Sequence, residues 1–363
     1  MGAVGSLGIG AAAVLGVQAV ATTTTVVGQA SPAQSASAPA GFIPGYRPGT
    51  SNGPLGDSST STGSTTTASA AQQVGIVEIN TVLRYQNARA AGTGMVLTSD
   101  GEILTNNHVV DGATSVSVTI SSTGATYDAT VVGTDPTDDV AVLQLSGASG
   151  LRTAKLSTAD ATVGESVTGV GNAGGTGTLT AAPGTVTALD QSITATDESG
   201  GSAEQLTGLI ETDAAIQAGD SGGPLYGDDG TIIGMDTAAS SGQPADGYAI
   251  PIATARAIAG HIESGVDNSA IHQGTPAFLG VSMADGASGA TVAGALSGSA
   301  AERAGISAGD VITSVDGHPI GSASDLSSTL AGYAPGDRVT VTWTTTDGTG
   351  ESATVTLGSG PAD

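Results

Sequence analysis

The sequence predicts a mostly β protein with two folded units, preceded by an apolar segment and a polar linker. From about residue 72 onward, short runs rich in Val, Ile and Thr alternate with turns rich in Gly, Asp and Asn. Such spacing is typical of strands in a barrel or sandwich. Patterns with helical periodicity are few. Hydrophobic residues make up 39% of the chain, which is enough to build a core in each unit.

The composition excludes several classes of function. Lys and Arg number 8 against 33 Asp and Glu, so the formal net charge is −25 and a nucleic-acid partner is not expected. The chain has no Cys, which rules out disulfides, thiolate zinc sites and a cysteine nucleophile. Its 4 His do not cluster in sequence, so we expect no metal site and no cofactor.

The N-terminal segment, residues 1–21, contains a run without charged residues from residue 3 to residue 21. A run of roughly 18–20 mostly apolar residues is long enough to span a bilayer. Three interpretations remain open: a transmembrane anchor, a secretory signal, or a disordered start rich in Gly and Ala. The first predicts a single-pass protein of the cell membrane and the second a secreted protein. Both place the remaining chain outside the cytoplasm.

Residues 22–71 are dominated by Thr, Ser, Ala, Gly and Pro, with no hydrophobic periodicity. This composition buries too little apolar surface to offset the entropy of ordering, so we expect a disordered linker. Prolines stiffen it locally at Pro32, Pro39, Pro44, Pro48 and Pro54.

The first folded unit is predicted to span residues 72–265. Its helix, Ile252–Ser264, places Ile252, Ala255, Ile258, Ala259 and Ile262 on one face and closes the unit. The expected strands are Val74–Ile79, Gly94–Thr98, Ser115–Ile120, Thr130–Val132, Val140–Leu145, Ser166–Val170, Gly184–Leu189, Leu209–Thr212, Thr231–Asp236 and Gly247–Pro251.

A short linker, residues 266–275, leads to a second unit over residues 276–358. Two helices are expected there, Ala300–Ala304 and Ser322–Gly332, and Ser322 with Asp325 forms a capping-box pair. The expected strands are Ala277–Met283, Ala290–Leu296, Asp310–Val315, Arg338–Thr344 and Ser352–Leu357.

A glycine-rich motif in the first unit carries the candidate nucleophile, Ser221. Glycine permits tight turns with backbone N–H groups close to a substrate, and acyl transfer requires a nucleophilic oxygen beside such donors. The motif alone is weak evidence, because a surface turn has the same composition. It reads Gly219-Asp220-Ser221-Gly222-Gly223-Pro224-Leu225.

A candidate base and a candidate orienting acid lie upstream. His108, the only histidine before Ser221, follows a strand that ends at Thr105. Asp139 opens the apolar run to Leu145, where a half-buried carboxylate would hold the imidazole in one tautomer. Asp138 and Asp135 are rivals for this role, but the residues between them form a turn signal.

The order His108, Asp139, Ser221 is that of the trypsin-like barrel, not of subtilisins or α/β-hydrolases. The serine motif also matches the nucleophile elbow of α/β-hydrolases. That fold requires a helix directly after the serine and alternating strands and helices, and neither pattern is present.

These motifs resemble those of the HtrA (high-temperature-requirement) family of serine proteases, whose members carry a PDZ domain. The resemblance covers roughly residues 72–358 and implies a trypsin-like double β-barrel followed by a PDZ domain, with an anchor and linker before it. The motifs that carry it are Thr105-Asn106-Asn107-His108-Val109-Val110, Asp139-Val140-Ala141-Val142-Leu143, the serine motif, Ala215-Ile216, Tyr248-Ala249-Ile250-Pro251, Phe278-Leu279-Gly280-Val281 and Ala308-Gly309-Asp310-Val311-Ile312.

The resemblance implies a role for each catalytic residue. Ser221 attacks the scissile carbonyl, His108 transfers the proton, and Asp139 orients His108. The N–H groups of Gly219 and Ser221 form the oxyanion hole.

The resemblance also implies a substrate pocket shaped by Ile216, Met235, Asp236 and Thr237. Ala215 occupies the usual position of the pocket base. Because Ala215 is not acidic, we expect a small aliphatic P1 residue rather than Lys or Arg. Asp220 departs from the amide that is commonest in the family, and its role stays open.

In the second unit, Phe278, Leu279, Gly280 and Val281 match the loop that binds a peptide carboxylate. The resemblance implies unfolded proteins and peptides as substrates, C-terminal peptides at the PDZ domain, and a membrane contact through residues 3–21. Family members are commonly trimers, but few aromatic residues lie near residue 75 to build that interface, so the oligomeric state stays open. Two alternatives remain: a catalytically idle peptide-binding module, and a resting protease that a PDZ ligand activates.

Overall fold

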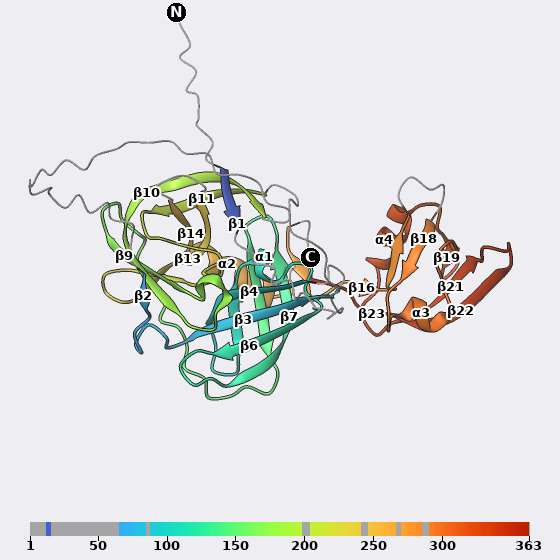
Figure 1. Ribbon diagram of the computed structural model, residues 1–363, viewed down its shortest axis with the longest axis horizontal. Helices are drawn as coiled ribbons and strands as arrows, with labels where there is room; N and C mark the ends of the chain where they lie inside the picture. Colours follow the sequence, from blue (N-terminus) through green and yellow to red (C-terminus); the bar gives the residue numbers. More distant parts are fainter. Residues whose placement is uncertain are drawn as a thin grey trace, which may run out of the picture.

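The computed structural model describes residues 12–15, 65–84, 88–197, 204–240, 246–265, 270–284 and 290–362. These residues form a large β unit and a smaller C-terminal unit (Figure 1). Most of the predicted membrane or signal segment and of the predicted linker lies outside the described ranges. Four residues of the former, β1 (Ala12–Leu15), pair in parallel with β10 (Thr180–Asp197). No helix in the described ranges is both long and apolar enough to cross a membrane.

The first barrel closes through antiparallel pairing around a complete ring of strands. Neighbours pair in the order β7-β6-β3-β4-β5-β8, and β8 pairs back with β7. The strands are β3 (Ile76–Leu83), β4 (Ala88–Val96), β5 (Glu102–Thr105), β6 (Ser115–Ile120), β7 (Thr126–Asp135) and β8 (Val140–Leu145). A short helix, α1 (Asn107–Val110), follows β5 at the rim.

The second barrel closes in the same way. Its ring runs β10-β11-β14-β13-β12-β9, and β9 pairs back with β10. Its other strands are β9 (Ser166–Gly171), β11 (Glu204–Thr212), β12 (Pro224–Tyr226), β13 (Ile232–Ser240) and β14 (Gly247–Pro251). A 3₁₀ turn, η2 (Ala173–Gly175), follows β9. The mostly β prediction with a pair of barrels is therefore confirmed.

The closing helix, α2 (Ile252–Glu263), contacts β7 and β8 of the first barrel and β13 and β14 of the second. The five residues predicted for its apolar face are the five that it buries. They belong to the main hydrophobic cluster, which also contains Leu104 and Val140 of the first barrel and Met235 of the second. The helix therefore helps to fix the two barrels relative to each other.

Both predicted linkers are shorter than expected. Within residues 22–71, β2 (Thr66–Thr67) pairs with β10, and Ala68 is buried in the main cluster. Within residues 266–275, β15 (His272–Gln273) pairs with β7, and Ile271 is buried. Residues 66–68 and 271–273 therefore belong to the folded protein, because two residues of each segment pair with a strand and the third is buried.

The C-terminal unit has its own core around Trp343 and Leu326. Its sheet runs β17-β18-β19-β21-β22, and β20 pairs with β19. The strands are β16 (Ala277–Phe278), β17 (Val281–Met283), β18 (Ala290–Ala295), β19 (Val311–Val315), β20 (His318–Pro319), β21 (Arg338–Thr344), β22 (Gly350–Thr356) and β23 (Gly358–Ser359), and the helices are α3 (Ala300–Ala304) and α4 (Ala323–Leu330).

The single strand predicted over Ala277–Met283 is divided in the structure. Gly280, at a φ of 84°, separates β16 from β17, and the two strands belong to different sheets. The predicted cap is present: the Ser322 hydroxyl accepts the Asp325 N–H at 3.1 Å. The Asp325 carboxylate, however, accepts the N–H of Gly321 and not that of Ser322.

The chain returns to the large unit after β23. The Ala362 N–H donates to the Ala113 carbonyl at 3.1 Å, and the Gly112 N–H donates to the Ala362 carbonyl at 2.8 Å. Ala362 is buried there, and the end of the chain lies beside α1 and β7 (Figure 1). The predicted second unit, residues 276–358, therefore stops short of the segment that contacts the first barrel.

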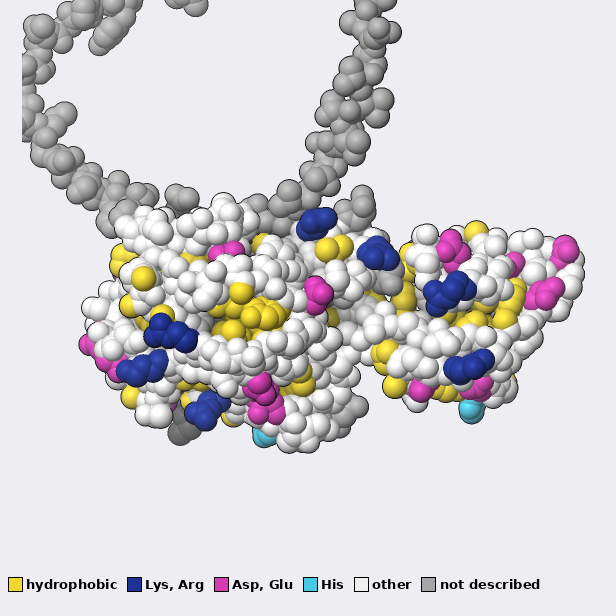
Figure 2. All heavy atoms as spheres, turned by 90° about the horizontal axis from the view of Figure 1, so that it is seen from below, with side chains coloured by type: hydrophobic (Ala, Val, Ile, Leu, Met, Phe, Trp, Pro, Cys, Tyr) yellow, Lys and Arg dark blue, Asp and Glu magenta, His cyan; other side chains and the backbone are white. Residues whose placement is uncertain are grey.

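Charged side chains are sparse on the surface. On the face in Figure 2, the few Lys and Arg side chains lie in small groups or singly, and Asp and Glu side chains are scattered over the same face. Apolar side chains gather in patches on both units. That face offers no cluster of basic residues of the kind that binds a nucleic-acid backbone.

Candidate active site

His108 lies in α1, directly beyond the end of β5. Asn106 occupies the position before this short helix, and its side-chain amide donates to the Asp139 carbonyl at 2.9 Å. The His108 N–H donates to Asp139 Oδ1 at 3.0 Å. The turn that holds the histidine is thus tied to the start of β8 through both a side chain and the backbone.

Asp139 receives donors from both barrels. His108 Nδ1 lies 3.0 Å from Oδ1 and 2.9 Å from Oδ2. The Thr237 hydroxyl, on β13, donates to Oδ2 at 2.5 Å. Asp139 is fully buried and has a φ of 54°, a left-handed conformation that Asp tolerates better than most residues. Its carboxylate therefore fixes the imidazole with Nδ1 as the donor.

The two rival acids face elsewhere. Asp135 Oδ1 accepts the N–H groups of Thr137 and Asp138, which is an Asx turn. Asp138 is exposed. Among these three acids, Asp139 is the one whose carboxylate contacts the His108 ring in the described structure.

The serine loop, Gly219–Gly223, connects to β12 and contacts both barrels. Thr93, on β4, donates its N–H to the Ser221 carbonyl at 2.9 Å and its hydroxyl to the Gly219 carbonyl at 2.8 Å. The Gly222 N–H donates to the Asp236 carbonyl on β13 at 2.8 Å. Gly219 and Gly222 have φ of 96° and 80°. A Cβ at either would fall within 2.4 Å of a backbone carbonyl oxygen, so only glycine fits.

Ser221 lies at the seam between the barrels with 3% exposure. Its hydroxyl donates to the Thr237 carbonyl at 3.3 Å. Thr237 therefore contacts two of the three predicted catalytic residues, one through its hydroxyl and one through its carbonyl. Thr237 is predicted from the sequence as a pocket residue, and its contacts place it between Asp139 and Ser221.

The backbone around Ser221 leaves two donors unused. The Ala218 carbonyl accepts the Gly174 N–H at 2.7 Å, and the Gly219 carbonyl accepts the Thr93 hydroxyl. Because C=O and N–H point in opposite directions across a trans peptide, the Gly219 N–H points away from η2. Within the described part of the chain, the N–H groups of Gly219 and Ser221 have no acceptor.

Two further carboxyl groups are buried beside the serine loop. Burial raises the pKa of Asp220 to about 7, although the Gln217 N–H bonded to its carboxylate opposes this shift. Burial also raises the pKa of Asp236 well above its ordinary value, and the nearby Asp220 charge raises it further. Asp236 is fully buried.

The predicted pocket residues point in different directions. Ile216 is 5% exposed and packs against Gly169 of β9 and Gly247 of β14. Met235 instead belongs to the main hydrophobic cluster. Because side chains alternate along a strand, Met235 and Asp236 project from opposite faces of β13. Met235, Asp236 and Thr237 are all fully buried, and the pocket that they were expected to form with Ile216 stays a prediction.

The expected carboxylate-binding loop lies between β16 and β17. Leu279 is buried in the core of the C-terminal unit, whereas Phe278 and Val281 are partly exposed. The Leu279 and Gly280 carbonyls accept the N–H groups of Ala301 and Leu296, each at 2.9 Å. Within the described residues, no acceptor is found for the Leu279 or Gly280 N–H. The neighbouring β17 is an edge strand, and α4 contacts β18 next to it.

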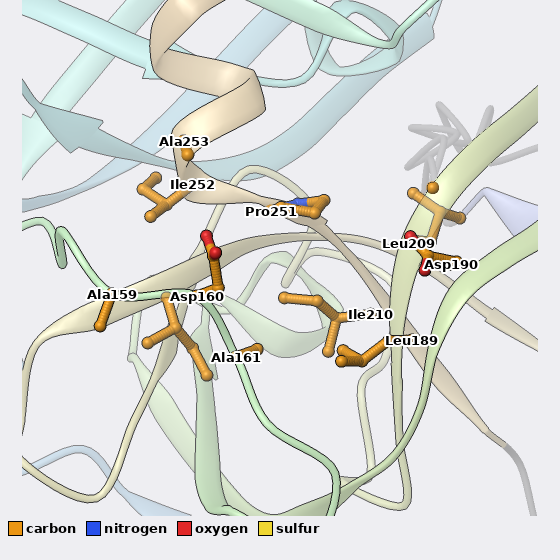
Figure 3. A pocket seen from close by; sticks show the side chains of 12 residues that line it. Ala159, Asp160, Ala161, Leu189, Asp190, Leu209, Ile210, Pro251, Ile252 and Ala253 are labelled. Atoms are coloured by element: carbon orange, nitrogen blue, oxygen red, sulfur yellow. The ribbon is translucent and has the colours of Figure 1, made fainter.

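A separate cavity of about 260 Å³ lies in the second barrel (Figure 3). The side chains of Leu189, Ile210 and Ile252 line it, and Asp160 directs its carboxylate toward the start of α2. No residue predicted for catalysis or for the pocket borders it.

Thr93 and Gly174 are not among the residues that the sequence predicts for the site, and Asn106 is named there only as part of the histidine motif. Thr93 stands between Gly92 and Gly94, and a Cβ at Gly92 would lie 3.3 Å from the Ser221 carbonyl oxygen. Glycine on both sides of a strand residue marks a close backbone approach, and this signal was available in the sequence.

Both units of the fold are similar to known protein families. Residues 92–235 match the family model of a trypsin-like peptidase domain, and residues 277–357 match that of a PDZ domain. The periplasmic serine endoprotease DegP of Escherichia coli K12 is 35% identical over 273 residues, which are 71% of this chain and 55% of DegP. The serine protease PepD of Mycobacterium tuberculosis is 34% identical over 306 residues, which are 78% of this chain and 63% of PepD.

Among solved structures, the serine endoprotease from Yersinia pestis covers 80% of this chain and 98% of its own, with 25% identity and a TM-score of 0.44. The chain spans between 55% and 63% of the length of the two curated relatives described above.

The double barrel and the domain after it define a trypsin-like peptidase fold joined to a PDZ domain. The chain belongs to the HtrA family of serine proteases.

Proposed function

We propose that this protein is an extracytoplasmic serine endopeptidase that cleaves unfolded or damaged proteins through an acyl-enzyme. The observation that carries the proposal is the contact of His108 Nδ1 with both carboxylate oxygens of Asp139, at 2.9 and 3.0 Å. A histidine held in this way presents Nε2 as a base, and Ser221 lies on the neighbouring loop. The endoprotease names of the relatives support the reaction class.

In the proposed mechanism, Ser221 Oγ attacks the scissile carbonyl while His108 accepts its proton. Oγ now bonds to the Thr237 carbonyl at 3.3 Å, and a rotation about χ1 would bring it toward the imidazole. Catalytic hydrogen bonds commonly tighten only when substrate binds. Asp139 stabilises the imidazolium, and His108 then donates the proton to the leaving amine.

The oxyanion is proposed to bind the N–H groups of Gly219 and Ser221. Each such donor lowers the barrier by on the order of 3 kcal/mol. The hydrogen bonds that hold the Ala218 and Gly219 carbonyls away support a hole that exists before substrate binds.

We propose a small aliphatic residue at P1. Ile216 fills the space between two glycines, Gly169 and Gly247, where a deeper pocket would otherwise open. A Cβ on Gly169 would lie only 2.3 Å from the Ile216 Cδ1, so the packing here is tight. Large or basic P1 side chains would have to displace Ile216.

The PDZ domain is proposed to bind peptide C-termini and to gate activity. An extended peptide would add to the edge of β17, while the N–H groups of Leu279 and Gly280 would hold its carboxylate. The name of one solved relative, an HtrA-type protease with a decapeptide, supports peptide binding in the family.

We also propose that residues 3–21 anchor the protein in the cell membrane, which requires β1 to leave β10, with secretion as the outcome if they are removed. A homotrimer is the proposed assembly, by resemblance to the family. Detergent extraction with N-terminal sequencing tests the first proposal, and light scattering of the purified protein tests the second.

The deciding experiment compares casein cleavage by the full chain and by Ser221→Ala, with and without a peptide that ends in hydrophobic residues. Cleavage by the parent alone supports the proposal, and a rate that rises with peptide supports gating. If both proteins bind the peptide and neither cleaves under any condition, the idle peptide-binding module replaces the peptidase.

A further inference from the structure

Two carboxyl side chains, Asp220 and Asp236, are buried behind the serine loop in a way that the proposed mechanism does not use. Asp236 Oδ1, Asp236 Oδ2 and Asp220 Oδ1 are buried and have no hydrogen-bond partner among the described residues. The remaining oxygen, Asp220 Oδ2, accepts the Gln217 N–H at 2.9 Å. Burying one unpaired carboxylate is strongly unfavourable, and burying two side by side is worse.

The space for this pair is made by two glycines on one face of β9. Gly169 and Gly171 lie two residues apart, so their missing side chains would project to the same side, roughly 6.5 Å from each other. A Cβ on Gly169 would lie 3.1 Å from Asp236 Oδ2, and one on Gly171 would lie 2.5 Å from Asp220 Oδ1. The two carboxyls therefore occupy adjacent positions against the same strand face.

Among the described residues, no ion pair is found for Asp220 or Asp236. The titratable groups on the elements packed around the pair are Asp213 before the loop, Tyr226 on β12, Tyr248 on β14 and, across Thr237, Asp139 with His108. None of these groups is hydrogen-bonded to the three unpartnered oxygens. Asp213 is exposed and accepts the Thr185 N–H.

The same two residues hold the serine loop. Asp220 precedes Ser221 and bonds back to Gln217 through its side chain. The Asp236 N–H donates to the Gly223 carbonyl, and the Asp236 carbonyl accepts the Gly222 N–H, each at 2.8 Å. Any force between the carboxyls therefore acts directly on the backbone around Ser221.

We propose that Asp220 and Asp236 share one proton and act as a positioning pair, which keeps the serine loop in its catalytic conformation only while that proton is bound. A protonated carboxyl donates O–H to the neighbouring carboxylate and satisfies two of the unpartnered oxygens. Loss of the proton to solvent leaves two adjacent buried charges that repel each other. The inference on activity rests on the proposed peptidase function; the shared proton itself does not.

The sign of the pH effect follows from this arrangement. The pKa of Asp220 is about 7, so the pair loses its proton when the pH rises to about 7 or above. The ascending limb of the rate profile belongs to His108, which must lose its proton to act as a base. The descending limb then belongs to the carboxyl pair, so kcat/KM falls as the solution becomes alkaline.

The first test measures kcat/KM for an unfolded substrate from pH 5 to pH 10. We compare the full chain, Asp220→Asn, Asp236→Asn and the double variant, with the exposed Asp228→Asn as the control. The parent and Asp228→Asn are expected to lose activity about tenfold per pH unit on the descending limb. In both single variants the descending limb of kcat/KM is expected at a pH at least one unit higher than in the parent. The double variant is expected to show no further shift. An unchanged limb in an active Asp236→Asn overturns the proposal.

A second test does not depend on activity. Infrared difference spectra between Ser221→Ala and Ser221→Ala/Asp220→Asn/Asp236→Asn are recorded across the same pH range, so that the bands of other buried carboxyls such as Glu102 cancel. The proposal predicts a protonated-carboxyl C=O band in the difference spectrum that persists at pH 6 and disappears on the alkaline side. If the difference spectrum shows no such band at pH 6, no proton is shared. A peptidase assay that fails while this band titrates removes the proposed function and leaves the carboxyl pair.

Discussion

Thr93 on the first barrel donates its hydroxyl to the carbonyl of Gly219 on the second, at 2.8 Å. The same hydroxyl accepts the Asn172 N–H at 2.9 Å, and the Thr93 carbonyl accepts the Thr105 hydroxyl. Thr93 is fully buried. One side chain from the first barrel thus fixes the Gly219–Asp220 peptide, which lies between the two peptides whose N–H groups form the proposed oxyanion hole.

Thr93→Val is therefore expected to lower kcat about tenfold to a hundredfold with little change in KM. The substitution leaves the Gly219 carbonyl and the Asn172 N–H unpaired in a buried position, a loss of about 1–3 kcal/mol. Steady-state kinetics on a peptide substrate measures the effect. Thr93→Ser keeps the hydroxyl and should retain most of the activity; an equal loss in both variants would assign the effect to packing.

Asp139→Asn is expected to reduce kcat by about 10⁴-fold, because an amide does not hold the imidazole in the required tautomer. The matched control is Asp138→Asn, at the exposed neighbouring residue. Circular dichroism confirms that both variants fold, and casein cleavage measures the rate. A similar loss in the two variants would show that Asp139 has no special role.

Ile216→Ala is expected to shift P1 preference from small aliphatic residues toward larger ones such as Leu or Met. The truncation opens space between Gly169 and Gly247 and lowers the free energy of unfolding by about 2–4 kcal/mol. Cleavage rates of a substrate library that varies the P1 residue measure this preference. Ile233→Ala, a buried residue on β13, is the control for stability, and it should leave the P1 ranking unchanged.

Glu263→Gln is expected to raise the stability of the protein above pH 7 and to change it little below pH 4.5. Burial raises the pKa of Glu102 from 4.5 to about 7. A hydrogen bond with Glu263 and the negative charge of Glu263 both contribute to this rise. The native state therefore binds a proton that the unfolded state releases, so stability falls as pH rises through this window. Because Glu102 is partly exposed, the effect is modest.

Urea unfolding at pH 4 and pH 8 measures this change, with the exposed Glu351→Gln as the control. The difference in unfolding midpoint between Glu263→Gln and the parent should be larger at pH 8. The same difference at both pH values would contradict the assignment to Glu102.

Ala362→Pro is expected to speed hydrogen exchange at Gly112 by at least tenfold. Proline removes the N–H that bonds the Ala113 carbonyl, and the partner bond from Gly112 to Ala362 weakens with it. Mass spectrometry of the peptide that contains Gly112 measures the exchange. Pro361→Ala leaves both backbone bonds in place and should leave that exchange rate unchanged.

Much of the fold could be predicted because local patterns reflect burial. The bounds of β6, β8 and β14 coincide with the predicted strands, and α2 buries the predicted face. The strand predicted over Gly184–Leu189 extends as β10 from Thr180 to Asp197. Its added residues are largely Thr, Ala and Asp, and they are extended because β9 and β11 supply hydrogen bonds that no local pattern reveals.

The candidate site likewise contains residues that local motifs predict and contacts that local motifs do not predict. His108, Asp139 and Ser221 stand in local motifs, and the structure brings His108 and Asp139 into contact. Thr93 and Gly219 are far apart in sequence, so their contact depends on how the barrels meet. Helix α1 has four residues, too few to show a helical period.

The path of the chain around the PDZ domain has a mechanical consequence. The chain departs at β15, which pairs with β7 just before the turn to Asp139, and it returns at Gly112 and Ala113, just after the helix of His108. A domain that is attached to its neighbour at two points rotates less freely than a domain that is attached by a single linker. Both attachment points therefore adjoin the segments that carry His108 and Asp139, and neither adjoins the serine loop.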